Sequence, residues 1–208
     1  AGLDKQGNIM AWEQHIVGQS IMANTLMAGM IEEGVDPTSV EGAAGGYAIP
    51  HINVQLHTTD LGVPIQWWRS VGHTHTGYST EVFMDELAAA AEQDPVIYRI
   101  NLLRDQPRLL GVLRLAADKA GWGTALPKGK GRGVAVVESF KTYVAQVAEV
   151  TVHDDGTYSV DKVTLAVDCG WAINPDVVYA QMSGGVGFGL SAALSGKITL
   201  KEGKVEQS

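Results

Sequence analysis

Cysteine, charged residues and long apolar runs are all scarce in this sequence of 208 residues. The single cysteine, Cys169, excludes an intrachain disulfide and any zinc or iron–sulfur site built from several cysteines. Charged residues make up 18% of the chain and the net charge is −8. Because the only basic cluster is the short run of Lys128, Lys130 and Arg132, we expect no nucleic-acid partner and no anionic membrane partner.

Targeting segments and spanning helices are not evident in the sequence. No apolar stretch reaches the roughly 18 residues of a spanning helix, and the first residues lack the regions of a signal peptide. The chain has no initiator Met and opens directly on a strand–turn–strand pattern. We therefore expect no membrane span here, and we expect the chain to be an interior piece of a longer protein.

Apolar residues make up 45% of the chain, which is enough for a core and argues against disorder. Hydrophobic periodicity predicts helices in the middle of the chain, strands before and after them, and a late glycine-rich helix. The expected strands cover residues 9–17, 47–58, 134–138, 143–152 and 158–167, and the expected helices cover 79–92, 105–120 and 174–194, with a further helix from Pro95 and a terminal hairpin at 198–206. Asp154-Asp155-Gly156 predicts a hairpin turn between the strands at 143–152 and 158–167. The pattern predicts an α+β fold with mixed or antiparallel sheets and packed helices. We divide it into a first part, 1–126, and a second part, 127–208.

Common catalytic motifs are missing. The chain contains no Gly-x-Ser-x-Gly nucleophile elbow, and no two carboxylates stand out as an acid–base pair. His73 and His75 lie two residues apart without a nearby third ligand, so a polar loop over residues 73–77 is favoured over a metal site.

Two other segments keep two interpretations each. The glycine run at 184–190 does not fit the dinucleotide fingerprint. Its glycines are costly in a helix, by roughly 1 kcal/mol each, so either a flat cofactor or a second helix must pack closely there. The run Trp67 to Gly72 precedes a loop that leads to a helix N-terminus, which suits anionic oxygens. A structural arginine stacked on tryptophan is the favoured interpretation from the residues alone.

Several blocks of sequence together resemble the molybdopterin-binding large subunit of the xanthine dehydrogenase family, and within it the beta subunit of the isoquinoline 1-oxidoreductase type. The resemblance covers nearly the whole chain in the right order. The blocks are Tyr47-Ala48-Ile49-Pro50, Trp67-Trp68-Arg69-Ser70-Val71-Gly72, Glu81, Asp85-Glu86-Leu87-Ala88, Asp94-Pro95, Arg99, the run from Glu138 to Val150, Asp168-Cys169-Gly170, Asn174-Pro175 and Gln181-Met182-Ser183-Gly184-Gly185. The resemblance implies that the fold belongs to the cofactor-binding domain of molybdenum hydroxylases.

The resemblance also implies roles for individual residues. The segment containing Trp68, Arg69, Ser70 and Gly72 matches a loop whose backbone approaches the molybdenum, and Val71 stands where many relatives place a substrate-stacking aromatic ring. Gln181 matches a glutamine that hydrogen-bonds the pterin or its surroundings. Gly184 and Gly185 match the close packing behind it.

The activity implied by the resemblance is hydroxylation of an N-heterocycle, isoquinoline-like, or of an aldehyde carbon, with water as the oxygen source. Electrons would leave through molybdopterin to a small [2Fe-2S] subunit, with a cytochrome as a further acceptor. The parent protein would be periplasmic or membrane-associated.

The chain departs from the family pattern at one decisive place. The family's catalytic glutamate lies in a Gly-Glu-Pro loop, and no Gly-Glu-Pro occurs in these residues. We therefore predict no catalytic residue and no direct metal ligand in this chain, and a piece that is inactive alone and binds no cofactor by itself. The alternative is a non-catalytic domain for subunit contact or cofactor insertion.

Overall fold

The computed structural model describes residues 1–207 and divides into two compact units, Ala1–Asp168 and the segment from Cys169 onward. Helices and sheets of both parallel and antiparallel pairing are present, so the α+β prediction is confirmed. The boundary expected after residue 126, between two parts of the cofactor-binding region, lies inside the first unit. That division stays a prediction.

The first unit begins with a three-stranded sheet in the order β1 (Gly2–Leu3), β2 (Ile9–Gly18), β3 (His51–Thr58). The first two strands are antiparallel, whereas β2 and β3 are parallel. A parallel pair needs a long crossover, and residues 19–50 supply it, with the short helices η1 (Ala28–Met30) and α1 (Pro37–Val40) within them.

The strand predicted over 47–58 is wrong in its first four residues, since β3 begins only at His51. The backbone N–H of Ala48 donates to the Leu102 carbonyl at 2.9 Å, and the Tyr47 ring is buried. These residues therefore bind the helical part of the unit instead of extending the sheet.

Three helices follow: α2 (His73–Ala90), α3 (Pro95–Leu102) and α4 (Pro107–Lys119). The predicted loop at 73–77 is wrong, because α2 starts six residues before the expected Ser79. Thr76 explains part of the difference, since its hydroxyl donates to the Glu41 carbonyl at 2.7 Å and to the Gly72 carbonyl at 3.0 Å. Tertiary contacts thus override the weak helix propensity of this polar segment.

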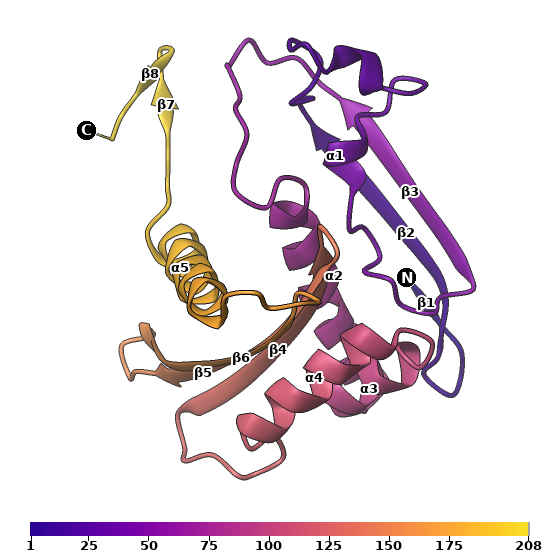
Figure 1. Cartoon of the computed structure of the whole chain (residues 1–208), viewed down its shortest axis with the longest axis vertical. Coiled ribbons are helices and arrows are strands. Elements are labelled where there is room, and N and C mark those ends of the chain that lie inside the picture. Colours follow the sequence, from indigo (N-terminus) through magenta and orange to yellow (C-terminus); the bar gives the residue numbers. More distant parts are fainter. Residues whose placement is uncertain (208) are drawn as a thin grey trace. The chain divides into compact units, whose positions relative to one another are not determined.

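The second sheet is antiparallel, in the order β4 (Lys130–Ser139), β5 (Thr142–Val152), β6 (Tyr158–Asp168). The predicted hairpin turn between β5 and β6 is confirmed, with Gly156 at a φ of 82°. Helix α4 packs against all three strands, and α2 packs against β4 (Figure 1). The core between them contains fully buried side chains, among them Met84, Leu113 and Val147.

The second unit contains α5 (Pro175–Leu194) and a two-stranded hairpin of β7 (Leu200–Lys201) and β8 (Lys204–Val205). The Asn174 side chain caps α5 by accepting from the N–H groups of Asp176 and Val177. No residue of α5 is buried, and by length and composition alone this helix could cross a membrane. That finding differs from the expected absence of any such stretch. Length and composition do not distinguish a span from the interior helix of a larger protein.

Candidate functional site

The residues predicted to face a cofactor in the first unit form the loop at 68–72, which leads directly into α2. Trp68 is 51% exposed, Arg69 and Ser70 are exposed, and Gly72 is buried. Ser70 and Val71 have φ values of 74° and 49°. Two consecutive non-glycine residues in the left-handed region are unusual, and such strain often marks a functional loop.

The lack of a side chain at Gly72 lets the loop lie close to the segment at 38–41. A Cβ atom at this position would collide with the Thr38 carbonyl oxygen and with the Glu41 side chain. The Ser70 hydroxyl donates to the Arg69 carbonyl and lies 2.9 Å from the Thr74 hydroxyl. The loop is therefore pressed against the segment at 38–41, while Trp68 and Arg69 remain at the surface.

The residues predicted in the second unit lie on α5. Gly184 and Gly185 follow Gln181 by three and four positions, so the three residues share one face of the helix. Gln181 is exposed and Gly185 is half-buried. A glutamine amide thus stands next to a stretch of helix surface without side chains, where a flat group can approach the backbone.

These two sets fit the group that the resemblance implies. Molybdopterin combines a flat, hydrogen-bonding pterin with anionic oxygens. A guanidinium at Arg69 and an amide at Gln181 are donors of the kind that such a group needs, and Gly184 and Gly185 add no Cβ atom to their face of α5. The structure brings together the residues within each set, and the two sets belong to different compact units.

His73 and His75 lie in the first turn of α2. Nε2 of His75 lies 2.8 Å from the Ser39 carbonyl oxygen, and Nδ1 of His73 is buried without a hydrogen-bond partner in the part of the chain that the structure describes. Within residues 1–207, no three His, Cys, Asp or Glu side chains are grouped so that they could hold a metal ion.

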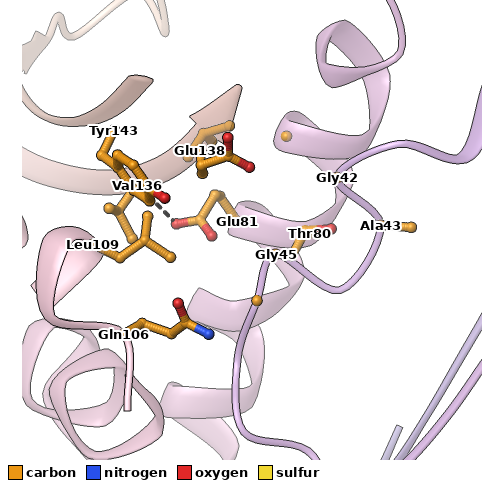
Figure 2. Close-up of a pocket in the computed structure, with 13 residues that line it drawn as sticks. Gly42, Ala43, Gly45, Thr80, Glu81, Gln106, Leu109, Val136, Glu138 and Tyr143 are labelled. Atoms are coloured by element: carbon orange, nitrogen blue, oxygen red, sulfur yellow. Dashed lines mark hydrogen bonds between the residues drawn. The ribbon is translucent and has the colours of Figure 1, made fainter. Parts of the chain in front are cut away.

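Sequence reasoning missed a pocket of about 340 Å³ in the first unit, shown in Figure 2. Its walls come from the glycine-rich segment at 42–46, α2, α4 and the β4–β5 hairpin, and none of the predicted site residues lines it. The hydroxyl of Thr80, on this wall, is buried without a hydrogen-bond partner among residues 1–207. Trp67, next to the predicted loop, lines another pocket of about 540 Å³.

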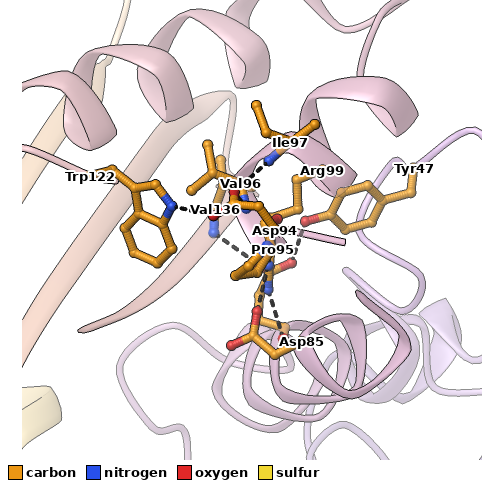
Figure 3. A network of polar contacts seen from close by, with 10 residues as sticks. Tyr47, Asp85, Asp94, Pro95, Val96, Ile97, Arg99, Trp122 and Val136 are labelled. Atoms are coloured by element: carbon orange, nitrogen blue, oxygen red, sulfur yellow. Dashed lines mark hydrogen bonds and ion pairs between the residues drawn. The ribbon is translucent and has the colours of Figure 1, made fainter. Parts of the chain in front are cut away.

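Sequence reasoning also missed a buried polar network around Arg99 (Figure 3). The guanidinium is fully buried and donates to the Glu81 carboxylate at 3.0 Å, the Glu81 carbonyl at 2.8 Å and the Pro95 carbonyl at 3.1 Å. It also pairs with the Asp85 carboxylate at 2.5 Å. Arg99 thereby joins α2 to α3.

Glu81 extends this network to the second sheet. Its carboxylate accepts hydrogen bonds from the Tyr47 hydroxyl at 2.8 Å and from the Val136 N–H at 2.9 Å. Burial raises the pKa of the Glu81 carboxyl, while the Arg99 guanidinium and these donors oppose the rise. The pKa of Arg99 is raised despite its burial, chiefly because Glu81 lies beside it, so the arginine stays charged. The sequence sign of this network is the spacing of Glu81 and Asp85, which lie one turn apart on one helix face.

An ion pair fixes the end of β6 at Asp168, the first residue of the Asp168-Cys169-Gly170 block. Arg108 on α4 donates from Nε at 2.8 Å and from Nη2 at 2.6 Å to the two carboxylate oxygens of Asp168. The guanidinium also lies 4.2 Å from the centre of the Tyr143 ring. This two-point contact holds the last residue of the first unit against α4.

Known proteins resemble this chain over most of its length. A model of the molybdopterin cofactor-binding domain family matches residues 69–208. The chain is 29% identical to the beta subunit of isoquinoline 1-oxidoreductase from Brevundimonas diminuta, over 100% of this chain and 27% of that protein. It is 33% identical to a membrane-bound aldehyde dehydrogenase (pyrroloquinoline-quinone) of Gluconacetobacter polyoxogenes, over 84% of this chain and 26% of that protein.

A third relative is a nicotinate dehydrogenase subunit of Pseudomonas putida, 28% identical over 98% of this chain and 19% of that protein. The chain therefore spans about a fifth to a quarter of the length of these relatives. Among solved structures, the aldehyde oxidoreductase of Desulfovibrio gigas matches 76% of this chain and 19% of its own, with 21% identity and a TM-score of 0.45. That of Desulfovibrio desulfuricans matches with the same coverage and identity and a TM-score of 0.38.

Proposed function

The chain belongs to the molybdopterin cofactor-binding domain family, and from this premise we propose that it forms part of the cofactor pocket of a molybdenum-dependent oxidoreductase. The observation that carries the proposal is the matched range, 69–208. This range begins at Arg69 in the exposed loop and includes Gln181, Gly184 and Gly185 on α5. All of the predicted contacts except Trp68 therefore fall within the matched range.

Each set of residues has a distinct part in this proposal. Arg69 supplies a fixed positive charge and up to five N–H donors to anionic oxygens. Ser70, Gly72 and the ring of Trp68 shape the loop surface around it, and Val71 contributes an aliphatic wall on the substrate side. On α5, Gln181 hydrogen-bonds a pterin edge while Gly184 and Gly185 let the ring lie close to the helix.

When bound, the cofactor supplies the redox chemistry that adds a water-derived oxygen to an electron-poor carbon of an N-heterocycle or aldehyde. The three relatives are named for isoquinoline, an aldehyde and nicotinate, which supports this substrate class. Two of them are named as subunits. That supports a multi-subunit assembly, in which we include a small [2Fe-2S] partner and a cytochrome acceptor.

We place the parent protein in the periplasm or at the membrane, and the support is the relative named as membrane-bound. We also propose that these 208 residues alone are inactive and hold no cofactor. The support for this is the small share of each relative that they span and the lack of a Gly-Glu-Pro loop glutamate among them.

The test uses the intact protein that contains this chain. Arg69→Ala and Gln181→Ala are expected to lower molybdenum per purified protein several-fold, because each removes a donor to the cofactor. Arg114→Ala, on an exposed position of α4, and Gln6→Ala, in the exposed first turn, are the matched controls and should keep the wild-type content. Wild-type molybdenum in both test variants would remove these residues from the site. Pyrroloquinoline quinone in place of molybdenum would contradict the proposed cofactor.

A further inference from the structure

The loop at 68–72 lies against a rigid turn formed by residues 36–41. Asp36 at the start of this turn is fully buried. Its carboxylate accepts from the Ser20 hydroxyl at 2.6 Å, the Met22 N–H at 3.2 Å and the Thr38 N–H at 2.9 Å. A carboxylate with this many donors fixes the surrounding backbone, so the turn is a stable base for whatever it contacts.

Glu41 is the side chain that connects this base to the loop. Its carboxylate accepts the N–H of Gly72 at 2.8 Å. This N–H precedes α2, where a negative charge is favourable because the first N–H groups of a helix point toward it. The Glu41 carbonyl accepts the Thr76 hydroxyl at 2.7 Å, and the Ser39 carbonyl lies 2.8 Å from Nε2 of His75. Three contacts from 39–41 therefore fix the first turn of α2.

The loop needs such a contact because its backbone is strained. Ser70 and Val71 both adopt positive φ immediately before Gly72, and non-glycine residues leave this conformation when nothing holds them. The Glu41 carboxylate is the only side-chain acceptor for the Gly72 N–H within residues 1–207. It therefore holds the loop from outside, in addition to hydrogen bonds within the loop such as that from the Val71 N–H to the Trp68 carbonyl at 3.0 Å.

We propose that Glu41 is a positioning residue for the candidate cofactor site: by holding the Gly72 N–H, it keeps the loop at 68–72 in the conformation that presents Arg69 and Trp68. This inference rests on the proposed function for its consequence, cofactor retention. Its structural part, the control of the loop by Glu41, stands on the hydrogen bonds alone.

The experiment compares Glu41→Ala, Glu41→Asp and Glu41→Gln in the intact protein. Gln keeps an oxygen at the same reach, whereas Asp keeps the charge but is one methylene shorter. Glu86→Ala, at an exposed position of α2, is the control. The readouts are hydrogen exchange of the Gly72 amide in cofactor-free protein, tryptic cleavage after Arg69, molybdenum per purified protein, and the midpoint of thermal unfolding.

We expect Ala and Asp to speed Gly72 exchange by about tenfold or more, because a charge-assisted hydrogen bond is lost. Both should also speed cleavage after Arg69 and lower molybdenum several-fold. Gln should give smaller changes than either, because it keeps the hydrogen bond without the charge, and the control should stay near wild type. Unchanged exchange in Ala and Asp would overturn the inference. Unchanged molybdenum content in Ala and Asp would also overturn it. The same holds for a loss of molybdenum that is explained by a lower midpoint of thermal unfolding. A wild-type protein without molybdenum would refute the proposed function, and the exchange data would still decide the structural part.

Discussion

Replacing Arg99 with Met tests the buried network most severely. Met matches the arginine side chain only as far as Nε, so the substitution removes the charge and all the donors and leaves the volume of the outer guanidinium unfilled. The Glu81 carboxylate would then be left 4% exposed with only the Tyr47 hydroxyl and the Val136 N–H as partners. Two carbonyls, of Glu81 and Pro95, would lose a donor as well.

The expected cost follows from the burial of the pair. Removing one partner of a buried ion pair costs about 3–5 kcal/mol of the free energy of unfolding. The contact with Asp85 adds little, because that side chain is 41% exposed and exposed pairs contribute about 0–1 kcal/mol. For a unit of this size the loss corresponds to a fall of roughly 6–20 °C in the unfolding midpoint.

The loss should depend on pH in a defined direction. Arg99 opposes the raised pKa of Glu81, so its removal raises that pKa further. A carboxyl with a raised folded-state pKa stabilises the fold below its unfolded pKa, and this stability is lost as the pH rises through the folded value. The deficit of Arg99→Met, measured by urea unfolding against wild type, should be largest near pH 7.5 and smaller near pH 5.

A double variant separates charge burial from lost packing. In Glu81→Gln with Arg99→Met, the amide oxygen can accept from Val136 N–H and the amide can donate to the Tyr47 oxygen, so no buried charge remains. We expect the double variant to be more stable than Arg99→Met alone. A single variant within about 1 kcal/mol of wild type at pH 7.5, or a double variant less stable than it, would refute the reasoning.

Two further predictions concern capping and acid stability. Asp94→Ala should lower the free energy of unfolding by about 1–2 kcal/mol, measured by chemical unfolding. Asp94 caps α3 through the N–H groups of Val96 and Ile97, and it also accepts a hydrogen bond from Trp122 Nε1 at 2.8 Å. Asp94→Asn should cost less, and equal losses for Ala and Asn would contradict the capping role. Asp36 is buried, which raises its pKa, but donors including the Ser20 and Thr38 hydroxyls lower it more, so the net pKa lies below its ordinary value. Its stabilisation is therefore present above the unfolded pKa and is lost as the pH falls through the folded value. Asp36→Asn should destabilise the protein at pH 7 but show a shallower loss of stability below pH 4 than wild type, and parallel curves would count against this.

The sequence predicted the elements whose signals are local. The hairpin at 154–156 and the helix starts at Pro95 and Pro175 carry turn or capping residues, and the structure confirms them. Segments that depend on distant partners were predicted less well. Residues 73–77 look like a loop because their hydroxyls and glycine disfavour helix, yet contacts from 39–41 make them the first turn of α2.

The same limit applies to side-chain roles. A helix beginning at residue 79 would place Glu81 and Asp85 near its N-terminus. The early start of α2 places them in its middle instead, where they pair with Arg99. Glu41 carried no signal at all, because its importance depends on Gly72, 31 residues away. The residues assigned to the cofactor came from the resemblance, and their roles remain predictions, since sequence spacing does not encode which distant side chains come together.

The most direct test of the account is metal and pterin analysis of the purified intact protein that carries this chain. We predict molybdenum in stoichiometric amount together with a pterin, both reduced in Arg69→Ala and Gln181→Ala and retained in Arg114→Ala. A folded wild-type protein that contains neither molybdenum nor pterin when produced in cells that make the cofactor would contradict it.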